Sequence, residues 1–166
     1  MSIADTLIME LDQEAKATRA ILARVPDDKL AWKPHVKSMS LGFLAQHIAT
    51  TPGGAAQMGS VETIDFADIS PPPEPESAAA IVATFEAGVA QAKAILAGMD
   101  DASMLKNWSI TRDGRCVMSV PRIGFYRSVL FNHLYHHRGQ LSVYLRLLDI
   151  PVPSIYGPSA DENPFG

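Results

Sequence analysis

The sequence has one cysteine, no excess of positive charge and no long apolar run, and each absence excludes a class of protein. Cys116 has no partner for an internal disulfide, so a disulfide-stapled scaffold is excluded. The 14 Lys and Arg residues stand against 18 Asp and Glu, a formal net charge of −4, whereas electrostatic binding of nucleic acid requires a basic stripe. No run approaches the ~18 apolar residues of a membrane span.

Signals for targeting and for common nucleotide or hydrolase chemistry are also lacking. The N-terminal segment MSIADTLIMELDQEAK carries acids where a signal peptide has a basic flank. We find no Gly-rich phosphate loop, no GxSxG motif and no repeat of about 20–50 residues. We therefore expect one domain over residues 1–166, in a soluble cytoplasmic protein that binds neither membrane nor nucleic acid.

The 12 prolines fall in clusters, and the stretches between them have the periodicity of helices. Helices are predicted over residues 2–24, from residue 41 after the N-cap Ser40, over residues 78–97 and over residues 121–148. Pro52, Gly53 and Gly54 are expected to disturb the second helix. Asp113-Gly114 favours a short hairpin before the last helix, and residues 149–166 are expected to be an irregular tail. The predicted fold class is an all-α four-helix bundle.

Three of the five histidines lie in the segment NHLYHHRGQ of the last helix. At about 100° per residue, His133 and His137 lie roughly 40° apart on the apolar face of that helix, one turn apart. Two imidazoles so placed can converge on one ion, as in the HExxH motif of metalloproteases. The glutamate of that motif is absent here, so a metalloprotease is not indicated.

A metal site needs a third ligand from another helix, and His47 is the best candidate. Three neutral histidines would leave an open position for water or a substrate, which is typical of catalytic rather than structural sites. The alternative is that these histidines only pack and hydrogen-bond in the core. Gln140 can orient a ligand or cap a core hydrogen bond, and His136 is expected to be merely packed.

Other polar or reactive residues receive simpler interpretations. We expect His35 in a loop exposed to solvent, and Cys116 as a small buried hydrophobic residue. Trp32 and Trp108 are interpreted as packing residues. The arginines of the last helix lie away from its apolar face and are expected to meet solvent: Arg127, Arg138 and Arg146.

Two segments resemble the DinB family, the DinB/YfiT-like group of metalloenzymes. They are WKPHVKSMSLGFLAQHIAT (residues 32–50) and NHLYHHRGQLSVYLRLLDIPVPSIYGPSADE (residues 132–162). The resemblance implies an up-down-down-up four-helix bundle, a site for nickel or zinc, and a homodimer. Its metal ligands are one histidine of the second helix and an H-x-x-x-H pair of the fourth, which match His47, His133 and His137.

The resemblance also implies a reaction class, because related proteins are transferases and isomerases that use low-molecular-weight thiols. Our first hypothesis is an enzyme whose three-histidine metal site activates a small thiol or water to attack an electrophilic substrate, as in thiol S-transfer. Metal-assisted hydrolysis is the alternative from the same site. A non-catalytic metal- or ligand-binding protein of the stress response is the second hypothesis. No catalytic side chain is assigned.

Overall fold

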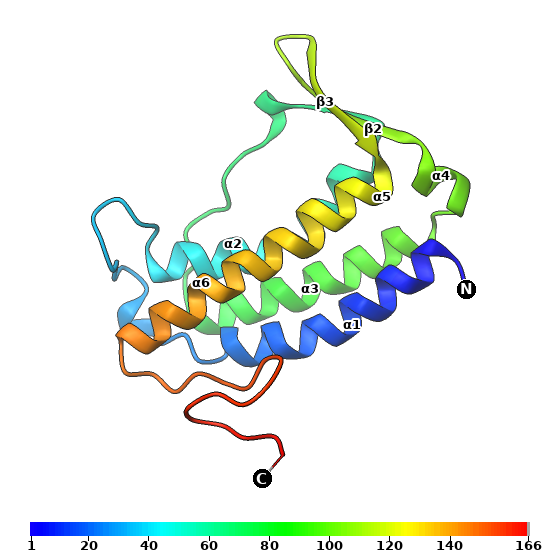
Figure 1. Cartoon of the computed structure of the whole chain (residues 1–166). Coiled ribbons are helices and arrows are strands. Elements are labelled where there is room, and N and C mark those ends of the chain that lie inside the picture. Colours follow the sequence, from blue (N-terminus) through cyan, green and yellow to red (C-terminus); the bar gives the residue numbers. More distant parts are fainter. Residues whose placement is uncertain (166) are drawn as a thin grey trace.

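Four long helical segments form the body of the protein (Figure 1). The structure, a computed structural model, describes residues 1–165. Helix α2 packs against α3 and α6, and α1 packs against α3 and α6. In Figure 1, α2 and α3 run in one direction, while α1 and α6 run in the opposite direction. The bounds of these helices are α1 Ile3–Leu22, α2 Leu41–Ser60, α3 Ala78–Ala97 and α6 His133–Leu147.

Side-chain caps begin the first three of these helices where the sequence predicts. The Ser2 hydroxyl accepts from the Asp5 backbone N–H, and the Asp5 carboxylate accepts from the Ser2 N–H, which completes a capping box. Ser40 caps α2, and Ser77 caps α3. The predicted starts are therefore confirmed to within two residues. Shorter helical pieces lie between them: η1 Asp27–Lys29, η2 Phe66–Asp68 and α4 Asp101–Leu105.

Helix α2 continues through Pro52 because its glycines let it pack closely on α3. A Cβ added at Gly53 would lie 3.1 Å from the Gly88 Cα, so the two backbones are in near contact there. Pro52 and Gly53 are both buried at this crossing. The expected disturbance at these residues does not end the helix, since packing outweighs the local helix-breaking tendency of proline.

The all-α prediction is wrong, because the chain also forms a three-stranded mixed sheet. Strands β2 (Asn107–Arg112) and β3 (Arg115–Pro121) are antiparallel. They confirm the predicted hairpin, in which Asp113 and Gly114 both have positive φ, as a tight two-residue turn needs. Strand β1 (Thr63–Asp65) pairs in parallel with β2. The hairpin projects beyond the helices in Figure 1.

The last helical stretch is also not the single regular α-helix predicted for residues 121–148. It starts with α5 (Arg122–Phe125), continues as the π-helical segment η3 (Tyr126–Asn132) and becomes α6 at His133. Pro121 is the N-cap of α5 rather than a residue of its first turn. Single π-helical turns are rare and occur often at functional sites.

One predicted surface arginine is buried and holds the irregular tail. Arg138 is only 2% exposed, and its guanidinium pairs with the Glu14 carboxylate at 2.7 Å. The Tyr156 hydroxyl donates to the same carboxylate at 2.8 Å. Arg138 therefore joins α6 to α1 and to the tail, and its expected solvent exposure is wrong. Arg127 and Arg146 are half-exposed, each in an ion pair.

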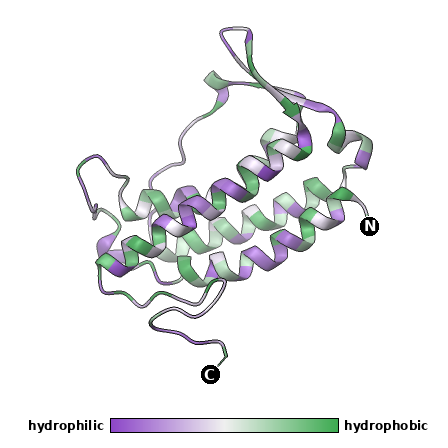
Figure 2. Ribbon diagram, in the orientation of Figure 1, coloured by the Kyte–Doolittle hydropathy of each residue, from purple (hydrophilic) through white to green (hydrophobic). Residues whose placement is uncertain are grey.

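Helix α3 is long enough and apolar enough on average to cross a membrane, by length and composition alone. It is not an unbroken apolar run, because Glu86 and Lys93 lie within it. In this fold α3 buries Phe85 and Leu96 against the neighbouring helices, and its Glu86 and Lys93 pair with charged residues of α1. Figure 2 shows α3 as predominantly hydrophobic, with few hydrophilic residues along it. Only about a third of its most apolar stretch is buried, so α3 buries one stripe of side chains and leaves the rest partly or fully exposed.

Candidate metal centre

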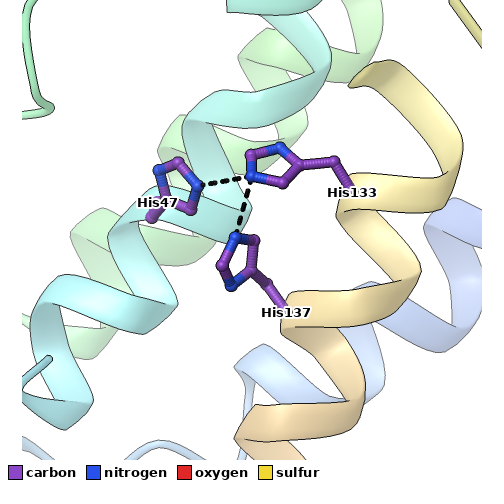
Figure 3. Close-up of side chains that lie close together, drawn as sticks. All are labelled: His47, His133 and His137. Carbon is purple, nitrogen blue, oxygen red and sulfur yellow. Dashed lines mark hydrogen bonds between the residues drawn. The ribbon is translucent and has the colours of Figure 1, made fainter. Parts of the chain in front are cut away.

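The three predicted histidines meet between α2 and α6. His47 comes from α2, and His133 and His137 come from the first turns of α6 (Figure 3). Their candidate ligand atoms all lie within 4.8 Å of one another. The Nε2 atom of His133 is 3.3 Å from that of His47 and 2.8 Å from that of His137. The predicted convergence of these side chains is confirmed.

Two features of the chain place the rings. His133 and His137 lie one α-helical turn apart, so both rings project from the same side of α6. The π-helical segment η3 ends directly before His133, and its wider turn sets the rotation at which α6 begins. His47 lies on α2 ahead of Pro52, beside core residues, and its ring crosses the gap between the helices (Figure 3).

Hydrogen bonds among the three rings cannot satisfy every ring nitrogen that faces another ring. The Nδ1 atom of His137 lies 2.8 Å from the Gln140 Oε1, which only accepts, so Nδ1 carries the proton and the neutral ring has a lone pair at Nε2. An N–H on His133 Nε2 can donate to this lone pair. The same N–H cannot also donate to His47 Nε2, which faces His133 Nε2 as well.

A shared cation would accept a lone pair from each ring and leave none unmatched. Around a tetrahedral ion with bonds of about 2.0–2.1 Å, ligand nitrogens lie roughly 3.3 Å apart. The spacing of 3.3 Å between His47 and His133 matches this value, and the 2.8 Å contact to His137 needs only a small opening. The donor set therefore fits a divalent ion such as zinc or nickel.

Burial keeps these imidazoles neutral, as metal ligation requires. Desolvation, together with the nearby His137 and His133, lowers the pKa of His47 to about 4. Desolvation likewise lowers the pKa of His133 and of His137, although the Gln140 hydrogen bond partly opposes this at His137. The cluster consists of histidines without a carboxylate, so a bound divalent ion would keep its full charge and favour an anionic further ligand.

A pocket of about 380 Å³ opens beside the histidines. His47 and His133 form part of its wall, so a molecule in the pocket can reach the point where the rings converge. Apolar side chains of α2 and of the segment before it form one side. The proline-rich loop that follows η2 forms another, through Pro71 and Pro72. This wall could not be predicted from the sequence, because a proline-rich loop carries no signal of what it covers.

The remaining predicted residues lie outside the three-histidine cluster, and one of them, Gln140, hydrogen-bonds to it. Gln140 orients His137, which is the first of the two roles considered for it. His136 is exposed, and its ring only packs edge-on against His137. His35 is exposed, as predicted. Cys116 is exposed on β3, so its predicted burial is wrong.

Both tryptophans pack as predicted. Trp108 is buried and stacks on Phe125 with ring centroids 4.0 Å apart. Its indole N–H donates to the Met58 carbonyl, which fixes the sheet against the end of α2. Trp32 meets Tyr144 edge to face. Neither ring borders the three histidines, so both act in packing.

Comparison with known proteins identifies the family. The sequence model of the DinB superfamily matches residues 10–141, most of the chain. The chain belongs to the DinB superfamily. All three clustered histidines of this DinB protein lie within the matched residues. The family resemblance of the two motif segments is thereby confirmed.

Individual relatives agree with this family assignment. The uncharacterized protein YrdA of Bacillus subtilis is 26% identical over 159 residues, which cover 95% of this chain and 90% of YrdA. A crystal structure of a DinB-like protein from Bacillus cereus aligns with a TM-score of 0.72 at 22% identity, over 93% of this chain and 98% of that one. The DinB-like protein YjoA of B. subtilis aligns with a TM-score of 0.71 at 18% identity, over 90% and 97% of the two chains. These two likenesses show a shared fold.

Proposed function

We propose that this DinB protein binds a divalent metal ion, nickel or zinc, through His47, His133 and His137, and that it is an enzyme. The observation that carries the proposal is the set of three Nε2 atoms whose contacts protons cannot all satisfy and a shared cation can. The adjoining pocket gives a reactant access to that point. A divalent ion supplies Lewis acidity, which lowers the pKa of a thiol or water so that it can act as a nucleophile.

The residues of the chain would bind the ion and orient its histidine ligands. Three histidine ligands leave a position open toward the pocket, which His47 and His133 both border. Gln140 fixes the tautomer and ring angle of His137. In the proposed thiol S-transfer, the thiol loses its proton to solvent and its sulfur bonds to an electrophilic carbon. The leaving group departs with the bonding electron pair. In the hydrolytic alternative, water takes the place of the thiol.

One observation favours a second candidate, a non-catalytic metal- or ligand-binding protein. The pocket wall contains no Asp, Glu, Lys or Arg side chain within the described residues 1–165, so it offers no charged group to protonate a leaving group. A thiol transferase acting on a substrate with a good leaving group does not need a group that protonates it. A measurement of substrate turnover therefore distinguishes the enzyme from the non-catalytic binding protein.

The test uses metal-loaded protein with a small thiol and 1-chloro-2,4-dinitrobenzene, and follows thioether formation; 4-nitrophenyl acetate reports hydrolysis. We expect metal-dependent turnover that chelation abolishes and that His47→Ala abolishes. His136→Ala is the matched control, because this histidine adjoins the site without joining the cluster. Equal turnover in metal-free protein contradicts the enzymatic proposal, and a bound ion without turnover of either substrate favours the non-catalytic candidate.

The proposed partners follow from this chemistry and from the family. They are a small-molecule thiol or electrophile and a second copy of the chain in a homodimer, in the cytoplasm. Sedimentation of untagged protein tests the dimer. A monomer at all concentrations would contradict that part of the proposal and leave the metal site unaffected, since all three histidines come from one chain.

A further inference from the structure

We propose that the pocket beside the histidines selects a small molecule that is uncharged and largely apolar apart from the group that reacts at the ion, and that it disfavours molecules with a further charged group. This inference rests on the proposed metal site, because the reacting group of the molecule is taken to lie at the open position there. It goes further by assigning the class of the bound molecule from the chemistry of the pocket wall.

The wall is apolar along most of its length. Met39, Phe43 and Met58 line it from α2 and the segment before α2. Val129 lines it from η3, and residues 69–72 close it as a strap of Ile, Ser and two Pro. Within the described chain, the two histidines are its only titratable lining residues. A carboxylate or ammonium group held against this wall, away from the ion, would lose water and gain no opposite charge from the lining side chains.

The polar groups of the wall are mostly committed to the protein backbone. Thr51 donates its hydroxyl to the His47 carbonyl at 2.7 Å, and Thr50 donates to the carbonyls of the preceding turn. Their oxygens can therefore only accept further hydrogen bonds. An anion needs donors, and Ser70, at the exposed rim, is the hydroxyl left to supply one. The donor pattern thus disfavours a carboxylate or phosphate group that lies against the wall, away from the ion.

Charged side chains lie in separate hollows on either side of this pocket. Lys33 and Glu74 line one hollow, which shares Met39 and Phe43 with the apolar pocket. Asp68 lines another, beyond Met58. Charged side chains of both signs therefore lie next to the apolar pocket but do not line it. Apart from the proposed ion, the pocket therefore presents an uncharged, largely apolar wall to its ligand.

Gly54 offers a way to fill the pocket without disturbing the histidines. It is an exposed residue of α2 that borders the pocket, and a Cβ built there meets nothing within 4 Å. Gly54→Leu would place a side chain in the pocket and raise the helix propensity of α2. Gly139→Leu is the matched control, because Gly139 is an exposed residue of α6 with an equally open Cβ position and lies away from the pocket.

The experiment compares two benzylic thiols on Co²⁺-loaded protein: neutral phenylmethanethiol, and 4-(mercaptomethyl)benzoate, which adds a carboxylate at the far end of the ring. Elemental analysis first measures Co²⁺ uptake, and visible absorption of the bound Co²⁺ then reports thiol binding. We expect phenylmethanethiol to bind at least about tenfold more tightly. We expect Gly54→Leu to weaken its binding at least about tenfold while hydrosulfide, which needs no pocket, binds as before. Gly139→Leu should change neither affinity.

The outcomes separate this proposal from the one beneath it. Equal or tighter binding of 4-(mercaptomethyl)benzoate overturns the assignment of an uncharged ligand while the metal site stands. Unchanged phenylmethanethiol binding in folded Gly54→Leu protein overturns it as well. If Gly54→Leu does not fold, the comparison of the two probes on the wild type still decides. Absence of Co²⁺ uptake overturns the proposed metal site, and the inference with it.

Discussion

The hydrogen bond between Gln140 and His137 gives a prediction that tests how the candidate metal centre is oriented. The Gln140 Oε1 accepts from His137 Nδ1 at 2.8 Å, which directs the His137 Nε2 lone pair toward the other rings. Replacing Gln140 by Leu keeps a similar volume and removes the acceptor. The His137 ring then loses its fixed tautomer and angle. Such outer contacts to ligand histidines are typically worth 10- to 100-fold in metal affinity.

We therefore expect Gln140→Leu to weaken metal binding by about 10- to 100-fold, which corresponds to roughly 1.4–2.7 kcal/mol. Gln140→Glu should bind the metal at least as tightly as the wild type, because a carboxylate accepts from the same N–H and offsets the charge of the ion. Competition against a chromophoric chelator measures both affinities. Urea unfolding of the metal-free variants checks that neither change acts through folding stability.

Two results would refute this reasoning. A change smaller than about twofold in Gln140→Leu would mean that Gln140 only satisfies a core hydrogen bond. Weaker binding in Gln140→Glu than in Gln140→Leu would mean that the Gln140 amide donates to Nδ1. His137 would then carry its proton on Nε2, and the argument from unsatisfied rings would fail.

Three further predictions follow from the fold. Arg138→Met should lower the free energy of unfolding by about 3–5 kcal/mol, because it leaves the Glu14 carboxylate buried and unpaired; urea titration measures this, and a loss below about 1 kcal/mol contradicts it. Gly59→Ala should cost about 1–3 kcal/mol, since its Cβ would lie 2.5 Å from the Tyr126 ring; an unchanged melting temperature contradicts that. Metal-free protein should lose stability as the pH falls from about 6.5 to 4. The unfolded chain takes up a proton at His47 in this window and the folded chain, with its pKa lowered to about 4, does not; a flat profile contradicts this.

The helices and the histidine pair could be predicted because their signals are local. Ser2 with Asp5 and Ser40 with the following turn specify caps within a few residues of chain. The spacing of His133 and His137 on an apolar face specifies that both rings enter the core from one side. The orientation of His47 was harder to predict, because the only indication of it was that His47 lies beside apolar residues of the second helix.

The features that were missed depend on contacts between distant segments. Strand β1 is three residues long and exists through pairing with β2, which lies more than forty residues later in the chain. The helical spacing alone places Arg138 on the solvent face, whereas in the fold Tyr156 of the tail and Glu14 of α1 cover it. The apolar pocket forms where a proline-rich loop lies over α2. No periodicity within one segment encodes these contacts.

The central claim is that three histidines of this DinB protein hold a divalent ion, and metal stoichiometry tests it most directly. Elemental analysis of untagged wild type is compared with a His133→Ala, His137→Ala double variant. A His35→Ala, His136→Ala variant is the control, because it removes two histidines that lie outside the cluster. We predict about one ion per chain in the wild type and in the control, and none in the His133→Ala, His137→Ala protein. A wild type that takes up no ion after soaking in zinc and nickel, or a cluster variant that keeps its ion, would contradict the account.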